Sequence, residues 1–158
     1  MFDLIAQVPQ LGSLKEVRAV NVQQGRRNPT IEVELQPTGY FAQAGFPTET
    51  IRIEARQGRD VSVYPADDSS RSWRHRYRDG SLCMWHPHDH RALRWLPQDG
   101  LVGLIRVASR HLIYEEIARR TGEWPVEESA HSKGARNRYL PGAVRTREMR
   151  LALKRLRR

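Results

Sequence analysis

Hydrophobic and polar positions alternate through the first part of the chain. The clearest case is 29–36, where Ile31, Val33 and Leu35 fall on one face and two glutamates on the other. A period of two is typical of a strand with one buried and one solvated face. Short connections between such strands favour an antiparallel meander. The predicted strands are 15–23, 29–36, 48–56 and 61–63, the last two joined by a turn at 57–60.

The period changes to that of a helix in the second half. Residues 101–120 carry an apolar stripe at helical spacing, with Asp99 as its expected N-cap and Gly122 as its expected stop. Residues 143–156 form a second, basic amphipathic helix candidate. At the N-terminus, Pro9 and Gly12 limit residues 1–14 to a short helix. The stripe consists of Leu101, Leu104, Ile105, Ala108, Leu112 and Ile117.

Length and composition indicate an α+β protein with one main domain. A chain of 158 residues suffices for one core. It has no apolar run of about 18 residues and no N-terminal signal pattern, so we expect no membrane span. A single cysteine excludes an intrachain disulfide and fits a reducing, cytoplasmic environment.

The net charge of +9 is confined to the C-terminal end. Up to residue 132 the chain has 17 Lys/Arg and 17 Asp/Glu, whereas 133–158 has ten and one. We therefore divide the chain into a domain at 1–132 and a basic tail at 133–158. Such a tail can contact phosphates, but only Tyr139 interleaves its charges for base stacking. Nucleic acid is accordingly not the expected partner, and a solvated tail is the simpler interpretation.

Cys83 lies in the stretch 65–100, which lacks periodicity and is rich in Asp, Ser, His, Trp and Pro. Long irregular segments in compact domains often carry function. Asp79-Gly80 predicts a turn just before the cysteine. Histidines on either side are able to activate a thiol, which reacts as thiolate. The competing interpretation is that Cys83 is a small buried hydrophobic residue.

A zinc site is a second interpretation of the same stretch. His86, His88 and His90 alternate, so an extended chain would direct them to one face near Cys83. Pro87 and the short spacing leave little freedom for tetrahedral geometry, and no second ligand cluster appears. We therefore predict no metal and no cofactor.

Several motifs in order resemble those of bacterial ubiquitin-conjugating-like proteins, in particular those encoded with cyclic-oligonucleotide anti-phage (CBASS) systems. The similarity covers about residues 75–131. The individual pieces are common, and their spaced combination carries the resemblance. They are Asp79-Gly80-Ser81-Leu82-Cys83-Met84, Trp85-His86-Pro87, Trp95, the long helix, Thr121-Gly122-Glu123-Trp124-Pro125 and His131.

The resemblance implies a ubiquitin-conjugating-like fold: an antiparallel meander, a loop bearing the active cysteine, and C-terminal helices. It implies that Cys83 accepts the C-terminus of a partner protein as a thioester and passes it to an amine. The partner would be the cyclic-nucleotide synthase of the CD-NTase type, with a separate activating enzyme as the source of the acyl group. His75 and His86 are the candidates for proton transfer beside Cys83.

One departure keeps a second function open. Eukaryotic members carry His-Pro-Asn before the cysteine, whereas the corresponding stretch here is His75-Arg76-Tyr77, without Asn. Either His75 or loop backbone amides take that role, or aminolysis proceeds differently. The alternative is a non-enzymatic binding partner or regulator of the synthase, for which Cys83 is dispensable. Glu115 and Glu116 are expected on the solvated edge of the helix, and Trp85, Trp95 and Trp124 in core packing.

Overall fold

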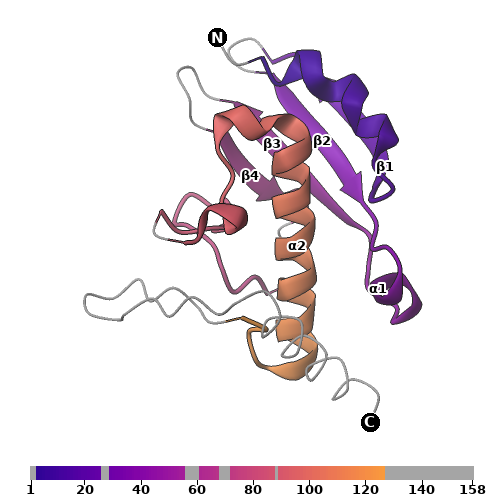
Figure 1. Cartoon of the computed structure of the whole chain (residues 1–158), viewed down its shortest axis with the longest axis vertical. Helices are drawn as coiled ribbons and strands as arrows, with labels where there is room; N and C mark the ends of the chain where they lie inside the picture. The colour runs from indigo at the N-terminus through magenta and orange to yellow at the C-terminus, as the bar shows by residue number, and fades with distance from the viewer. Residues whose placement is uncertain (1–2, 26–28, 56–60, 68–71, 88, 127–158) are drawn as a thin grey trace.

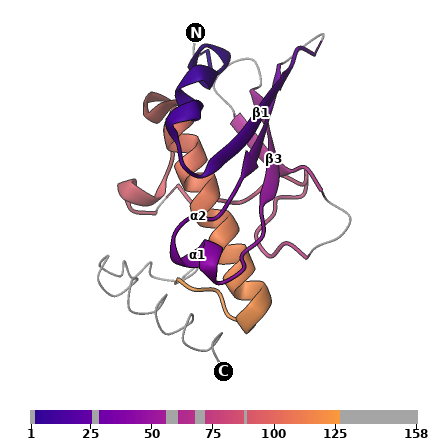
Figure 2. The same cartoon turned by 90° about the vertical axis from the view of Figure 1, so that its right-hand side faces the viewer.

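The structure, a computed structural model, describes residues 3–25, 29–55, 61–67, 72–87 and 89–126. A four-stranded antiparallel sheet lies against one long helix, with a short N-terminal helix beside it (Figures 1 and 2). The α+β prediction is confirmed. The elements are the 3-10 helix η1 (Ile5–Ser13), strands β1 (Val17–Gln23), β2 (Thr30–Leu35), β3 (Glu49–Ala55) and β4 (Val61–Pro65), helix α1 (Tyr40–Gln43), the 3-10 helices η2 (Arg91–Leu93) and η3 (Pro97–Asp99), and helix α2 (Gly100–Thr121).

The sheet is the predicted meander. Its strands follow the order β1-β2-β3-β4, and each pairs antiparallel with the next. Val33 lies opposite Ile51, and Ile53 lies opposite Val63, so their apolar side chains meet on one face. Val33, Ile51 and Ile53 are at most 1% exposed. The alternation read from the sequence therefore set which face of the sheet is buried.

Helix α2 is buried on more than one side. All six residues of its predicted stripe are buried, as expected. His111, Tyr114 and Glu115 are buried too, at 2%, 7% and 1% exposure. The prediction that Glu115 lies on a solvated edge is thus wrong. The stretch that follows β4 packs on a second side of the helix and encloses it there, since Glu115 is hydrogen-bonded to Arg74.

The ends of α2 depend on residues that are distant in sequence. Asp99 stands at the N-cap position, but its carboxylate makes no capping bond and accepts instead from the Leu96 amide at 2.8 Å. The Leu101 amide donates to Oε1 of Gln7, in η1, at 2.8 Å. Gly122 ends the helix with φ +75°, a left-handed conformation that favours glycine, as predicted.

Replacing Gln7 is expected to weaken the start of α2. Gln7→Ala removes the acceptor for the Leu101 amide, and loss of such a cap costs about 1 kcal/mol of unfolding free energy. Urea denaturation measures it. The control is Gln10→Ala, an exposed glutamine in the same 3-10 helix. Equal losses in both variants would contradict the capping role.

The stretch between β4 and α2 has little regular structure, as the sequence indicated. Its described residues contain only η2, η3 and one isolated bridge, Arg76–Leu82.

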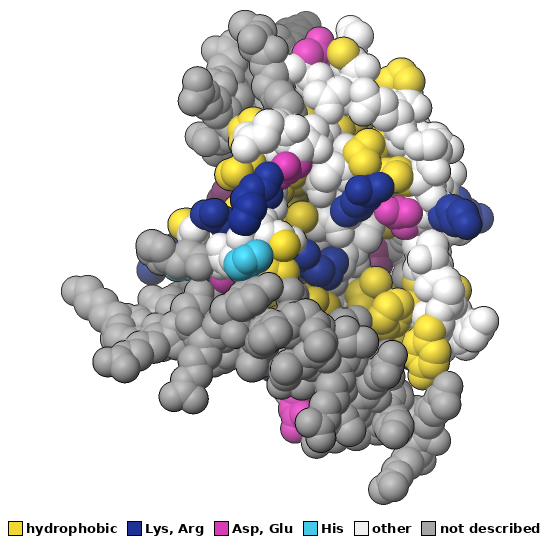
Figure 3. Space-filling view, in the orientation of Figure 1, with side chains coloured by type: hydrophobic (Ala, Val, Ile, Leu, Met, Phe, Trp, Pro, Cys, Tyr) yellow, Lys and Arg dark blue, Asp and Glu magenta, His cyan; other side chains and the backbone are white. Residues whose placement is uncertain are grey.

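No helix among the described residues has the length and apolar character to cross a membrane. On the face drawn in Figure 3, basic and acidic side chains are interspersed. The predicted turn at 57–60, the tail at 133–158 and its helix at 143–156 lie outside the described residues.

Candidate functional site

Cys83 lies on a short ribbon anchored to the edge of the sheet. The Leu82 amide donates to the carbonyl of Val63 in β4 at 2.7 Å. Beside it, the Cys83 amide donates to the carbonyl of His75 at 3.0 Å, and the Tyr77 amide to the carbonyl of Ser81 at 2.9 Å. Residues 75–77 and 81–83 thus form the two arms of a hairpin. The cysteine is fixed by backbone bonds on both sides.

The predicted Asp79-Gly80 turn joins these arms. Gly80 has φ +85°, a conformation that side chains disfavour. Asp79 accepts from the amide and the hydroxyl of Ser81, at 3.0 and 2.7 Å. The Arg76 guanidinium donates twice to the carbonyl of Gly80, at 2.9 and 2.8 Å. The turn is therefore held by charge-assisted bonds from both of its flanks.

Cys83 is a free, half-buried thiol. Its neighbour Leu82 is 4% exposed and belongs to the core, while Met84 packs against that core from its edge. Alternation along the arm places Leu82 inward and the cysteine side chain on the other face. Cys83 is therefore only partly enclosed, unlike a cysteine that fills the interior.

Tyr77 is a site residue that the sequence did not single out. It stands two residues from His75 on the arm opposite Cys83, and its amide donates to the carbonyl of Ser81. Partial burial, the neighbouring Cys83 side chain and the charge of Asp79 together raise the pKa of Tyr77 to about 12. The ring is still 52% exposed, an unusual state for a large aromatic residue. The signal in the sequence was the Asp-Gly turn, which brings residues on its two sides together.

His75 contributes its main chain and its ring to different parts of the site. Its carbonyl accepts from Cys83, whereas its ring packs on Trp124 with centroids 4.1 Å apart. The ring of His111 also lies near, at 6.3 Å. The structure therefore brings His75 beside Cys83 through the backbone. Proton transfer by its imidazole stays a prediction.

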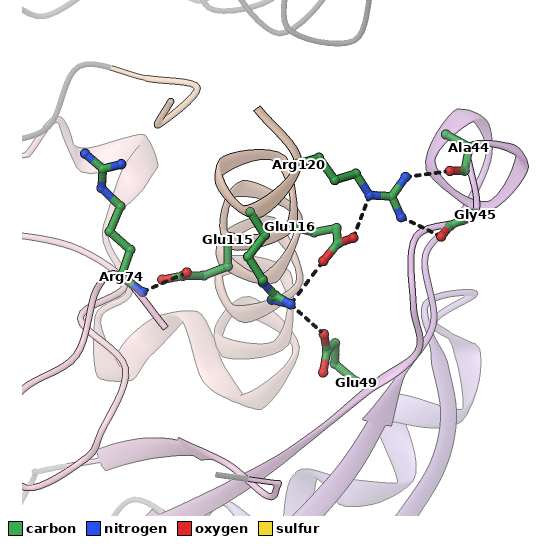
Figure 4. A network of polar contacts seen from close by, with 8 residues as sticks. Ala44, Gly45, Glu49, Arg74, Glu115, Glu116 and Arg120 are labelled. Atoms are coloured by element: carbon green, nitrogen blue, oxygen red, sulfur yellow. Dashed lines mark hydrogen bonds and ion pairs between the residues drawn. The ribbon is translucent and has the colours of Figure 1, made fainter. Parts of the chain in front are cut away.

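Glu115 is the second residue that the sequence missed. From α2 its carboxylate accepts from the amide of Arg74 at 3.0 Å (Figure 4). It also accepts from the amide of His75 at 2.9 Å and lies 3.5 Å from Nε2 of His111. Burial by itself raises the pKa of Glu115, but the nearby His111 side chain and the bonds from the two amides outweigh it, and the pKa is lowered. An ionised carboxylate thus holds the arm that faces Cys83.

The downstream histidines support turns. The amide of His86 donates to the Asp89 carboxylate at 2.7 Å, and Nδ1 of His90 accepts from the Ala92 amide at 3.3 Å. No group of three or more His, Cys, Asp or Glu side chains is placed to hold a metal ion within the part of the chain that the structure describes. His88, the middle histidine of the zinc interpretation, lies outside that part. The catalytic role of His86 stays a prediction.

The tryptophans near the site are mainly packing residues, as expected. Trp95 is 5% exposed, belongs to the core and donates from Nε1 to the carbonyl of Gly100 at 2.8 Å. Trp85 packs against the core beside it, with ring centroids 6.1 Å apart. Trp124 contacts the rings of His75, His111 and Tyr114. It therefore closes the cluster around Glu115 after α2 has ended.

These features define a class: an α+β domain that presents a half-buried cysteine on an anchored ribbon between its sheet and its long helix. The model of the family described as "Type II CBASS E2 protein" matches residues 10–132, so the chain belongs to that family. The resemblance inferred from the motifs is confirmed. Neither the curated proteins nor the solved structures gave a match.

Proposed function

We propose that the protein is a conjugating enzyme of type II CBASS anti-phage defence that works through a thioester on Cys83. The observation that carries this proposal is a half-buried cysteine, anchored through its own amide, in a member of the type II CBASS E2 family. The meander, the cysteine ribbon and α2 then correspond in order to a ubiquitin-conjugating fold.

The proposed reaction has two acyl transfers. The Cys83 thiolate first attacks the thioester that a separate activating enzyme holds, and the thiol of that enzyme leaves. An amine then attacks the new thioester carbonyl and releases Cys83. His75 and His86 are the proposed proton acceptors, and backbone amides of the ribbon are the proposed donors to the oxyanion in place of the absent Asn.

We further propose the cyclic-nucleotide synthase of the same defence system as the protein whose C-terminus is conjugated. The resemblance of the motifs around Cys83 to CBASS conjugating proteins implies this partner, and the family match to a type II CBASS E2 protein supports the setting. On the face drawn in Figure 3, acidic side chains are interspersed among the basic ones, so the described residues of that face form no broad basic platform for nucleic acid. We therefore place the protein among protein-modifying enzymes of the cytoplasm.

The test is adduct formation with purified components. Incubation with ATP, activating enzyme and synthase is expected to give a covalent adduct that reductant removes and that peptide mapping assigns to Cys83. The matched control combines Cys83→Ser with Ser13→Cys, which moves the only thiol to an exposed position in η1. Equal adduct on the relocated thiol, or none on the wild type, would refute the proposal.

A further inference from the structure

The chain turns back onto the cysteine ribbon after α2 has ended. Gly122 stands at the C-cap of the helix, and its carbonyl accepts from the Arg74 guanidinium at 3.4 Å. Oγ1 of Thr121 accepts from the amide of Glu123 at 3.2 Å. These bonds join the end of α2 to the arm of the hairpin and set the direction of the next residues. The Thr-Gly-Glu-Trp-Pro motif of the sequence thus directs Trp124 toward that arm.

Trp124 packs on the ring of His75. The two ring centroids lie 4.1 Å apart, with an angle of 46° between the planes. The indole also lies near the rings of His111 and Tyr114, at 5.7 and 5.9 Å, and both of these residues are buried. His111 is itself 6.3 Å from His75. The imidazole of His75 is therefore held in a cluster of rings, in which Trp124 is nearer to it than His111.

His75 stands directly opposite Cys83 in the hairpin. The Arg76–Leu82 bridge and the bond from the Cys83 amide to the His75 carbonyl fix this register. Residues directly opposite each other in an antiparallel pair have their side chains on the same face, with Cβ atoms about 4.5–5.5 Å apart. A ring that restrains His75 thus restrains the side chain next to the cysteine.

We propose that Trp124 is a positioning residue, which holds the imidazole of His75 on the face of the hairpin that carries Cys83. The inference rests on the proposed thioester function, in which His75 is a proposed proton acceptor. Trp124 takes no part in making or breaking bonds. It limits the orientations of the imidazole, and a contact between two rings favours one arrangement by about fivefold. A proton acceptor held in one orientation is more often in place when the amine attacks.

The experiment compares wild type with Trp124→Leu, which removes the flat ring. The matched control is Phe41→Leu, which removes a half-buried ring from α1. In single-turnover discharge of the preformed adduct by an amine, we expect the maximal rate to fall about fivefold in Trp124→Leu. The amine concentration at half-maximal rate should stay the same. Phe41→Leu should discharge like wild type, and Trp124→Phe, which restores a ring, should recover most of the rate.

A second measurement needs no partner protein. Diethyl pyrocarbonate acylates accessible imidazoles, and peptide mapping assigns the label to each histidine. Labelling of His75 should be about fivefold faster in Trp124→Leu than in wild type, because the indole no longer covers the ring. The exposed His90 serves as the internal reference and should react equally in both proteins. Trp124→Met fills more of the vacated space and carries the same expectations if Trp124→Leu does not fold.

A double-mutant cycle separates positioning from a general loss of stability. In a His75→Ala background the indole has no imidazole to hold, so Trp124→Leu should lower the discharge rate no further. Additive losses from the two substitutions would overturn the proposal, because a purely structural role acts without His75. A discharge rate in Trp124→Leu that equals or exceeds that of wild type would overturn it as well.

Failure of this inference is distinguishable from failure of the proposed function. A normally formed adduct that Trp124→Leu discharges at the wild-type rate would overturn the role of Trp124 and leave the thioester function intact. Absence of any wild-type adduct, with His75 labelled faster in Trp124→Leu, would remove the function and support the contact that holds the imidazole. Equal labelling of His75 in wild type and Trp124→Leu refutes that contact in either case.

Discussion

Cys83→Ser is expected to abolish acyl transfer, with a loss on the order of 10³-fold or more in rate. A serine hydroxyl is not ionised at neutral pH, whereas the thiolate is the reactive form of cysteine. At most a slow oxyester that resists reductant should remain. The fold should be unaffected, because the substitution is nearly isosteric and the side chain is half-buried. Gel analysis with and without reductant, together with thermal unfolding, measures both.

Phage protection in cells that carry a Cys83 variant distinguishes the two candidate functions. If the protein is an enzyme, Cys83→Ala should lower phage protection to the level of a strain without the gene. If it is a binding partner of the synthase, Cys83→Ala should retain both the complex and full protection. Ser13→Cys alone, which leaves Cys83 in place, should protect like wild type and controls for the effect of a surface change.

Glu115→Ala is expected to have the largest effect on stability, about 3 kcal/mol of unfolding free energy. It leaves the amides of Arg74 and His75 buried without their acceptor, and it removes the partner of His111. A loss of this size lowers the melting temperature by about 10 °C in a domain of this length. The arm opposite Cys83 would also lose its anchor, so adduct formation should fall with stability.

The matched control is Glu116→Ala, one residue further along α2. Glu116 pairs with Arg119 and Arg120 at 3.0 and 2.6 Å on another side of the helix (Figure 4). Ion pairs near the surface contribute about 1 kcal/mol or less. A loss in Glu116→Ala as large as in Glu115→Ala, by urea denaturation, would contradict the special role of the buried carboxylate.

Lowering the pH should remove the contribution of the Glu115 carboxylate to the stability of the fold. The pKa of Glu115 is lower in the folded protein than its ordinary value of 4.5, so its ionised form stabilises the fold. That contribution is fully present above about pH 4.5 and is lost as the pH falls through the folded-state pKa. Glu115→Gln should therefore lose less stability than wild type between pH 5 and pH 3. Parallel stability curves for the two proteins, from urea denaturation at each pH, would contradict the assignment.

The strands and α2 were predictable because their signals are local. Alternation at 29–36 placed Val33 inward, and the apolar stripe of α2 was buried in full. The Asp79-Gly80 turn and the stop at Gly122 follow from short-range backbone preferences that neighbours hardly change. The motifs around Cys83 are equally local in sequence, and they indicate the family to which the chain belongs.

Other parts of the site depend on contacts between distant positions. Glu115 looked like a solvent-exposed helix residue because its neighbours in sequence are polar, yet its partners lie about 40 positions earlier. Gln7 caps α2 from 94 positions away, which displaces Asp99 from the role that its residue type suggests. No periodicity reports such pairs, since hydrogen bonds between elements depend on how the elements pack.

The sequence by itself thus determined the strand meander, the long helix, the cysteine and the family to which they belong. Only the tertiary structure decided what surrounds that cysteine. It placed Tyr77 on the arm opposite Cys83, and it buried Glu115 behind that arm. The physical reason is that patterns record whether a residue prefers water or the interior. The partner of a buried polar group is selected by the fold as a whole, because each such group must find a hydrogen bond there.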